Sequence, residues 1–177
     1  FEMYGDQIEQ CVAAGKRHGI EVHPWKVNWN LSNAPPEFVE RMRREGRTQV
    51  SNTGEPIDWL CPSHPDNFRL ELETMLEVVR NYDVDGVHFD YIRYPSRRGC
   101  FCDGCRERFE AERGAPVESW PDDVYDGVLR PEYVDWRCEQ ITRLVRETAR
   151  QARELEPAVK ISAAVFGDYP SCRESIG

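Results

Sequence analysis

The sequence has no long apolar run, and none of its hydrophobic stretches approaches the roughly 20 residues of a membrane span. Positive charge is also scarce, with 23 Lys and Arg against 32 Asp and Glu and a formal net charge of -9. Nucleic acids and anionic membrane surfaces both require a basic face on their partner. This balance therefore argues against either partner. We also find no internal repeat, linker or low-complexity segment.

A secretory signal peptide is not visible, but Phe1 stands in the middle of a helical pattern, so we expect the natural N-terminus to lie upstream. The 177 residues are enough for one domain with a sizeable core. Aromatic residues make up 11%, which suits an ordinary core or a carbohydrate cleft. The seven cysteines cannot all pair with one another. Cys11 and Cys138 fall on apolar helix faces, so we expect small core residues there.

Apolar residues recur at helical and strand spacing in alternation along the chain. Helices are predicted at about 4–18, 63–82 (capped by Ser63) and 131–155. Strands are predicted at 20–29, 84–91 and 159–166, the last nearly all apolar and therefore expected to be buried on both faces. Two long polar segments, 30–58 and 96–130, are predicted loops, the first with a short helix near 36–44. The alternation predicts parallel strands joined by crossover helices.

The most informative segment is 84–95, VDGVHFDYIRYP. Because side chains alternate along a strand, His88 and Asp90 share one face, while Val87 and Phe89 share the other. The apolar face can pack under helices, and the polar face then carries a carboxylate that is costly to bury without a purpose. Enzymes with α/β folds keep their chemistry at the carboxyl ends of strands. We therefore predict a catalytic role for Asp90, the alternative being a structural Asp that caps a loop or pairs with Arg93.

His23 and His88 are expected at comparable depths beside Asp90, where they would contact the substrate or the carboxylate. The alternatives are two core histidines, or a metal site formed with Asp90. Trp25 shares the face of His23 and is expected to stack on a sugar ring. Sugar-cleaving enzymes usually need two carboxyl groups, and the sequence offers only one convincing member.

The residues that follow the strands extend this predicted site. Tyr91 is expected to contact substrate, and Arg93 with Tyr94 is expected to hold Asp90 ionised. Asp168 ends the third predicted strand, where it could reach the same mouth or simply cap a loop. Glu21 lies near the start of the first strand and is better interpreted as an ion-pair partner.

Three cysteines lie within six residues, at Cys100, Cys102 and Cys105. Thiolates at such spacing can surround one tetrahedral zinc ion, which then requires a fourth ligand. Cys61 and Cys172 both lie in loops at strand ends, so either could supply it. The alternatives are a disulfide or free surface thiols. We expect a structural zinc site and no cofactor for catalysis.

Four motifs together resemble the glycosyl-hydrolase-like family 10 proteins of bacteria. They are Glu21-Val-His-Pro-Trp25, Trp59-Leu-Cys-Pro-Ser-His-Pro65, Tyr82-Asp-Val-Asp-Gly-Val-His-Phe-Asp-Tyr-Ile-Arg-Tyr-Pro95 and Val159-Lys-Ile-Ser-Ala-Ala-Val-Phe166. The resemblance implies a partial (β/α)8 TIM barrel over residues 1–177, holding roughly strands 3 to 5. It also implies an exported enzyme (periplasmic, lipoprotein or extracellular) that acts on a polysaccharide, such as bacterial cell-wall glycan.

The resemblance assigns Asp90 as the catalytic carboxylate and His23 and His88 as pocket residues. The cysteine loop is similar to the zinc loop of family 42 β-galactosidases, which favours Cys61 as the fourth ligand. The sequence ends at Gly177, before the later strands of a barrel, so we expect this piece alone to be inactive. Two other functions stay open, a carbohydrate-binding pseudoenzyme and a metal-dependent hydrolase that uses both histidines with Asp90.

Overall fold

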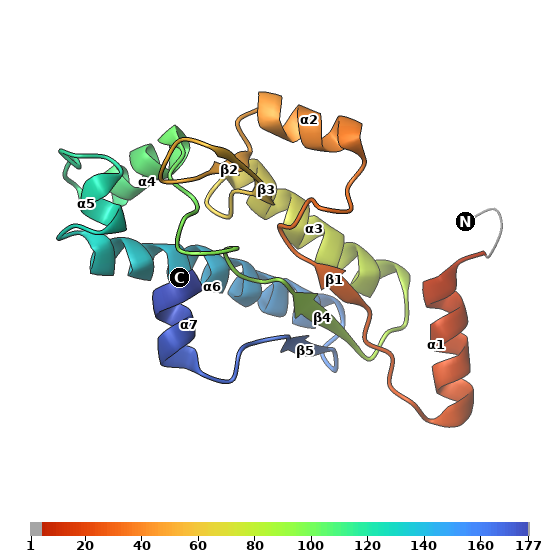
Figure 1. Cartoon of the computed structure of the whole chain (residues 1–177). Helices are drawn as coiled ribbons and strands as arrows, with labels where there is room; N and C mark the ends of the chain where they lie inside the picture. The colour runs from red at the N-terminus through yellow and green to blue at the C-terminus, as the bar shows by residue number, and fades with distance from the viewer. Residues whose placement is uncertain (1–4, 177) are drawn as a thin grey trace.

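Three parallel strands form the centre of the fold, in the order β1–β4–β5 (Figure 1). The computed structural model describes residues 5–176. The strands are β1 (Trp25–Val27), β4 (Gly86–Asp90) and β5 (Lys160–Ala163). Trp25 lies opposite His88, and His88 lies opposite Ser162. This register fixes which polar side chains share a row on the sheet. The predicted parallel α/β order is confirmed.

Two long helices cover one face of this sheet (Figure 1). They are α3 (Pro65–Asn81) and α6 (Arg130–Leu155), and each links two neighbouring strands. Val87 and Phe89 of β4 are only 1% and 0% exposed and belong to the same core cluster as Leu76 and Leu144 of these helices. The predicted apolar face of β4 is therefore confirmed. Burial of such side chains contributes about 1.5–3 kcal/mol each.

Both outer strands are shorter than predicted. The segment predicted at 20–29 pairs only over Trp25–Val27, and the one at 159–166 only over Lys160–Ala163. The third strand is not buried on both faces: Ile161 is partly buried against the core, but Ser162 is exposed on the opposite face. The parallel sheet therefore has one face covered by helices and one open face.

Helix ends follow local capping chemistry. In α1 (Gln7–His18), Asp6 accepts from the first-turn N–H groups, and Gly19 ends the helix at φ 65, a conformation that favours glycine. The predicted helix also included Tyr4, which lies outside the described residues. Cys11 is exposed rather than in the core, because α1 buries only the side that carries Ile8 and Val12. In α3 the cap is His64, not the predicted Ser63.

The polar segments hold more structure than predicted. Helix α2 (Pro36–Arg44) is confirmed, and an unpredicted hairpin follows it, formed by β2 (Thr48–Val50) and β3 (Pro56–Leu60). The second segment is not one loop, because it contains α4 (Asp103–Arg113) and α5 (Asp122–Tyr125); α7 (Tyr169–Ile176) follows β5. These elements are too short to give a clear apolar period. Among the described residues, no helix is long and apolar enough to cross a membrane.

A second core, built from cysteines and aromatic rings, lies beside the N-terminal end of α6. Tyr133 and Trp136 of α6 pack with Phe109 of α4, with ring centroids 5.0 Å (Phe109–Tyr133) and 5.3 Å (Tyr133–Trp136) apart. Gly99 leads into this core, and a side chain there would come within 2.6 Å of Gln49 Oε1. The hairpin and the segment after β4 therefore meet tightly at this point.

Candidate functional site

Asp90 is the last residue of β4, at its carboxyl end, as predicted. The backbone N–H of Asn28 donates to its carbonyl oxygen at 2.8 Å, which ties it to the end of β1. The N–H of Tyr91 donates to Asp90 Oδ1 at 2.9 Å, and Tyr91 has φ 54, an uncommon backbone conformation for a bulky residue. The side chain is partly exposed on the open face of the sheet. A carboxylate is thus held at the strand end where a ligand can reach it.

His88 and His23 do not lie at comparable depths, contrary to the prediction. His88 is in the row of Trp25 and Ser162, and its Nδ1 is 2.8 Å from Ser162 Oγ. His23 lies two residues before Trp25, beside Gly86, where a β-carbon would come within 2.5 Å of its Nδ1. The error arose because the depth of a residue depends on the pairing register, which the sequence does not contain.

The lower end of the sheet holds an ion pair that the sequence indicated. Glu21 forms an ion pair with Lys160 and a hydrogen bond with His23, whose Nε2 is 3.2 Å from its carboxylate. The hydrogen bond from Lys160, and then that from His23, lowers the pKa of the Glu21 carboxyl group below its ordinary value. His23 is thus occupied with Glu21, below the row of His88.

Arg93 lies among three aromatic side chains just beyond the strand end. Its guanidinium carbon is 5.4 Å from the ring centroid of Trp59, 5.1 Å from that of Tyr91 and 5.5 Å from that of Phe166. The rings of Trp59 and Tyr91 are themselves 5.6 Å apart. Such contacts between a cation and ring faces are attractive. Arg93 therefore has a defined position near Asp90, but no ion pair joins the two among the described residues.

Tyr94 and Asp168 were both expected to be able to reach the site of Asp90, and the structure places both in other roles. Tyr94 is fully buried in the second core, where the guanidinium carbon of Arg137 lies 4.1 Å from its ring centroid. Asp168 is exposed and accepts from the hydroxyl of Ser171 at 2.7 Å at the start of α7, which is the capping alternative. Trp25 is 65% exposed, unlike Trp29, so its ring is accessible on the open face.

A buried carboxylate that the sequence analysis missed supports the end of β1. Glu71 of α3 is buried, forms an ion pair with Lys26, and accepts from Asn28 Nδ2 at 2.7 Å and from the N–H of Trp29 at 3.4 Å. The sequence could have indicated this buried carboxylate, because Glu71 interrupts the apolar spacing of the predicted helix. Since the N–H of Asn28 donates to the carbonyl of Asp90, this network braces the strand end that carries the candidate carboxylate.

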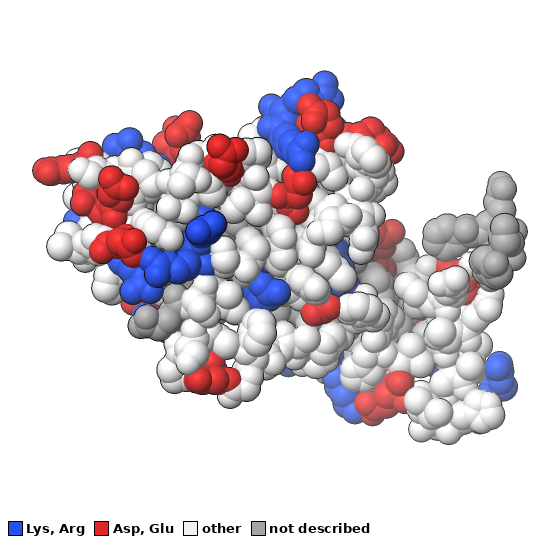
Figure 2. Space-filling model, in the orientation of Figure 1, with Lys and Arg blue, Asp and Glu red and all other residues white. Residues whose placement is uncertain are grey.

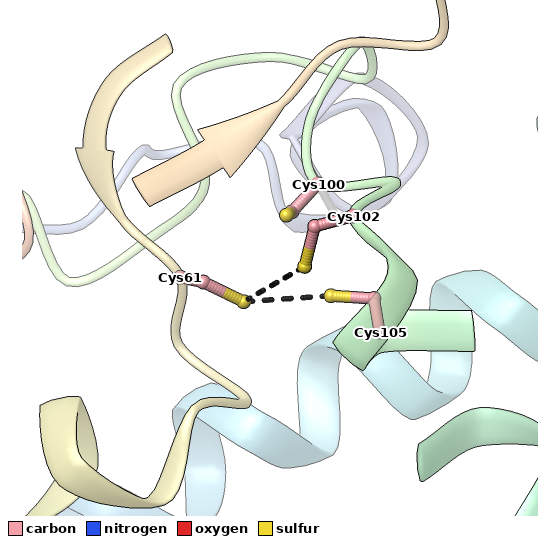
Figure 3. A group of neighbouring side chains, drawn as sticks. All are labelled: Cys61, Cys100, Cys102 and Cys105. Carbon is pink, nitrogen blue, oxygen red and sulfur yellow. Dashed lines mark hydrogen bonds between the residues drawn. The ribbon is translucent and has the colours of Figure 1, made fainter. Parts of the chain in front are cut away.

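Four cysteine sulfur atoms converge beside the hairpin (Figure 3). Cys61 follows β3, Cys100 and Cys102 precede α4, and Cys105 lies in its first turn; all four Sγ atoms lie within 4.8 Å of one another. The Cys61–Cys105 sulfur distance is 3.4 Å and the Cys61–Cys102 distance 4.0 Å. Four thiolates about 2.3 Å from one zinc ion would lie about 3.8 Å apart, which is close to this arrangement.

The surroundings of these sulfur atoms suit a cation. Cys61, Cys100 and Cys105 are buried, and none of the four cysteines forms a disulfide in the described part of the chain. Hydrogen bonds from the other three thiols lower the pKa of Cys61 well below its usual range, whereas burial raises that of Cys100 and Cys105. Without a cation, the cluster cannot hold several thiolates together. The donor set therefore fits a thiophilic metal ion such as zinc.

Two polar residues around the cluster were not anticipated. Ser63, predicted as a helix cap, has its Oγ 3.2 Å from Cys61 Sγ and 3.3 Å from Cys105 Sγ, and it accepts from Arg108 Nε at 3.2 Å. Cys172 lies elsewhere, in a cavity wall with Cys138. Among the described residues, the four cysteines are the group close enough to hold a metal, and His23, His88 and Asp90 form no such group.

The fold and this site together describe an α/β protein whose parallel sheet carries polar side chains on its open face. The chain belongs to the glycosyl hydrolase-like 10 family, whose sequence model matches residues 3–175. It is 36% identical over 200 residues to an S-layer-related protein of Niallia circulans, and 21% identical over 166 residues to the glycosyl hydrolase YngK of Bacillus subtilis (strain 168). The matches cover 94% and 92% of this chain but only 12% and 30% of those proteins.

Two solved structures share the fold at low sequence identity. The PgaB (BpsB) glycoside hydrolase domain from Bordetella bronchiseptica has a TM-score of 0.75 at 15% identity, over 98% of this chain and 51% of that chain. A β-galactosidase from Rahnella sp. R3 has a TM-score of 0.66 at 16% identity, over 89% and 27%. The predicted family is thus confirmed, and so is an α/β fold with a parallel sheet like that of glycoside hydrolase domains. The chain spans about half the length of the PgaB domain.

Proposed function

We propose that the protein containing this chain hydrolyses glycosidic bonds of a polysaccharide, with Asp90 as an essential carboxylate. The observation that carries the proposal is the position of Asp90 at the carboxyl end of β4, on the open face of the sheet. Glycosidases use such carboxylates as acid, base or nucleophile. In this proposal the protein is exported, which the name of the S-layer-related relative supports, and its polysaccharide is bacterial cell-wall glycan.

We also propose that the side chains around Asp90 bind the sugar. Trp25 is exposed for stacking in the row below, and His88 with Ser162 offers hydrogen bonds in that same row. Tyr91 is exposed beside Arg93. In this proposal His23 sits one row deeper and supports His88 from below, and Asp168 contributes from the start of α7. The candidates for substrate contact, with Asp90, are six of these residues: His23, Trp25, His88, Tyr91, Arg93 and Asp168.

The rest of the barrel completes the proposal. The strands β1, β4 and β5 would be roughly the third to fifth of a (β/α)8 barrel, which agrees with the 51% share of the PgaB domain that this chain covers. A second carboxyl group would then come from another part of the barrel, and residues 1–177 alone would be inactive. Glycosidase carboxyl pairs are about 5–10 Å apart, so the partner should lie that close to Asp90.

The test is Asp90→Asn in the intact protein, assayed by release of reducing ends from purified cell-wall glycan. The amide keeps the size of the carboxylate but loses its charge and nucleophilicity, so we expect turnover to fall on the order of 10³-fold or more with an unchanged fold. Asp122→Asn, at an exposed position of α5, is the matched control. Near wild-type turnover of the Asp90 variant would refute the catalytic role.

A carbohydrate-binding protein without hydrolytic activity is the second candidate. On the sheet rows described by Trp25–Val27, His88–Asp90 and Ser162–Ala163, Asp90 is the one carboxylate. In this case the intact protein would bind the glycan without releasing reducing ends, and Asp90→Asn would change its affinity only modestly. The same assay therefore separates the two functions.

We further propose that Cys61, Cys100, Cys102 and Cys105 hold one structural zinc ion. The convergence of the four sulfur atoms within 4.8 Å and the burial of three of them support this donor set. Four thiolates leave no position for water or substrate, so zinc here would supply folding free energy rather than catalysis. Cys61, and not Cys172, would be the fourth ligand, since Cys172 lies in α7 beside another cavity.

A further inference from the structure

Within residues 5–176, which the structure describes, no carboxylate balances the charge of Arg93. Its Nη1 donates to the carbonyl oxygens of Tyr94 at 3.1 Å and Pro95 at 3.4 Å. Among the described residues, no carboxylate forms an ion pair with it, whereas the nearby Arg97 and Arg173 each have an aspartate partner. A guanidinium group is always charged and has five N–H donors, and these two carbonyls engage only the donors of Nη1. Arg93 is therefore fixed in place but not neutralised.

Arg93 also lines a cavity of about 220 Å³ beside the strand ends. The other walls are mostly apolar and include Ile92 after β4, Ile141 of α6, and Val165 and Phe166 after β5. Val165 is 79% exposed and Phe166 is 56% exposed, so the apolar rim faces solvent. Pockets for whole small ligands usually measure about 300–1,000 Å³, so this one has room for a single substituent or ring of a longer molecule.

The electrostatic character of this surface is local rather than general. The chain as a whole has a formal net charge of -9. Figure 2 shows that basic side chains nevertheless gather near the centre of this face, over the segment after β4 and beside α7. Arg93, Arg97 and Arg98 belong to that segment. An anionic group arriving here meets positive charge against apolar walls, where a charge-assisted hydrogen bond is strong.

We infer that this cavity is a subsite for a carboxylate-bearing sugar, with Arg93 as the residue that recognises the carboxylate. The inference rests on the proposed function and names the substrate class: a polysaccharide that contains an acidic sugar. A planar carboxylate matches the guanidinium fork and can accept two N–H bonds, whereas a neutral hydroxyl would leave the charge uncompensated. Arg93 follows Asp90 by three residues, so the acidic sugar would lie next to the bond that Asp90 acts on.

Two matched monosaccharides test this subsite without any need for turnover. Methyl glucuronide and methyl glucoside differ only in the oxidation state of one carbon atom, and their affinities for the intact protein can be compared by ligand-observed NMR titration. We expect the glucuronide to bind at least tenfold more tightly. Because Asp90→Asn should keep this preference, the subsite can be tested even if the proposed hydrolysis fails.

Variants of the two arginines in the cavity wall assign the effect. Arg93→Gln should abolish the preference, and Arg93→Lys, which keeps the charge but loses the fork, should retain only part of it. Arg173→Gln is the matched control, because Arg173 lines the same cavity but is paired with Asp135; it should keep the preference. Equal binding of the two sugars to the unaltered protein, or an unchanged preference in Arg93→Gln with wild-type circular dichroism, would overturn the inference.

Discussion

The open face of the sheet and the cysteine core lie on either side of the segment 91–99, and they are built in opposite ways. On the sheet, Trp25 and Tyr91 are exposed, and within the described part of the chain the Asp90 carboxylate accepts only the N–H of the next residue, Tyr91. In the core, the sulfur atoms of Cys100 and Cys105 are fully buried among stacked aromatic rings. One region presents unused hydrogen-bonding capacity to solvent, and the other encloses its polar atoms.

The difference separates binding from support. A site must leave donors, acceptors and charges unsatisfied until a ligand arrives, and this costs stability. The cysteine core can compensate, because it fixes the hairpin and the segment before α4 against α6. Substitutions on the sheet face should therefore change binding and leave stability nearly intact, and substitutions in the core should do the reverse.

The largest expected effect comes from breaking the proposed zinc site. Cys105→Ala should abolish bound zinc, measured by elemental analysis of reduced protein, and lower the free energy of unfolding by about 4 kcal/mol or more, a size typical of losing a structural metal. A chelator should have the same effect on the unaltered protein. Cys11→Ser, at an exposed position, is the control and should keep one zinc per chain. A cysteine variant with unchanged metal content would contradict the assignment.

A core aromatic should behave unlike a sheet-face aromatic. Phe109 is 2% exposed and packs edge-on against Tyr133, so Phe109→Ala should cost about 3–5 kcal/mol in urea unfolding. Trp25→Ala should cost about 0.5 kcal/mol or less, because that ring is largely in solvent. A comparable loss in both variants would mean that the two regions do not divide the roles as described.

The hydroxyl of Tyr94 sharpens the comparison at a single atom. It is buried and has no hydrogen-bond partner, and burial raises the pKa of Tyr94 well above its usual range. An unpaired buried hydroxyl is unfavourable, so Tyr94→Phe should leave the free energy of unfolding, measured in urea, unchanged or raise it by about 1 kcal/mol at most. A clear loss of stability would instead reveal a partner at the cysteine cluster.

The smallest effect concerns the ion pair below the sheet. The pKa of Glu21 is lowered by the hydrogen bond from Lys160, so its contribution to stability is present above the ordinary carboxyl pKa of 4.5 and is lost as pH falls through the lowered value. Glu21→Gln should be slightly less stable than the unaltered protein near pH 7. The difference should vanish in acid below the lowered pKa, which chemical denaturation across pH can measure. Because the pair is exposed, a large difference would be unexpected.

Periodic features of the fold were predictable from the sequence. The helices at 63–82 and 131–155 and the strand at 84–91 were located within a few residues, because their apolar spacing is regular over their whole length. The hairpin, α4 and α5 were missed, since short elements stabilised by contacts with a distant core have little periodicity of their own. The strands that became β1 and β5 were predicted too long, because the length of a strand depends on how far its neighbour pairs with it.

The candidate site was predictable where it depended on local spacing. The strand-end position of Asp90 follows from alternation, and the trio of Cys100, Cys102 and Cys105 follows from its spacing. The depth of His23 depends on register, and the hydrogen bond expected from Tyr94 to Asp90 depends on long-range packing; both predictions were wrong. The unpaired charge of Arg93 could not be predicted from the sequence, because the whole fold decides which carboxylates come near it.

The cysteine cluster also has a consequence for chain entropy. Cys61 and Cys102 are 41 residues apart, and β4 with its preceding helix lies between them. Closing a loop of this length costs only a little more than closing one of half the length, by about 0.6 kcal/mol. A single closure nevertheless fixes both polar excursions at once. The hairpin after β1 and the segment after β4 should therefore order together, late and cooperatively, once the strand between them is in place.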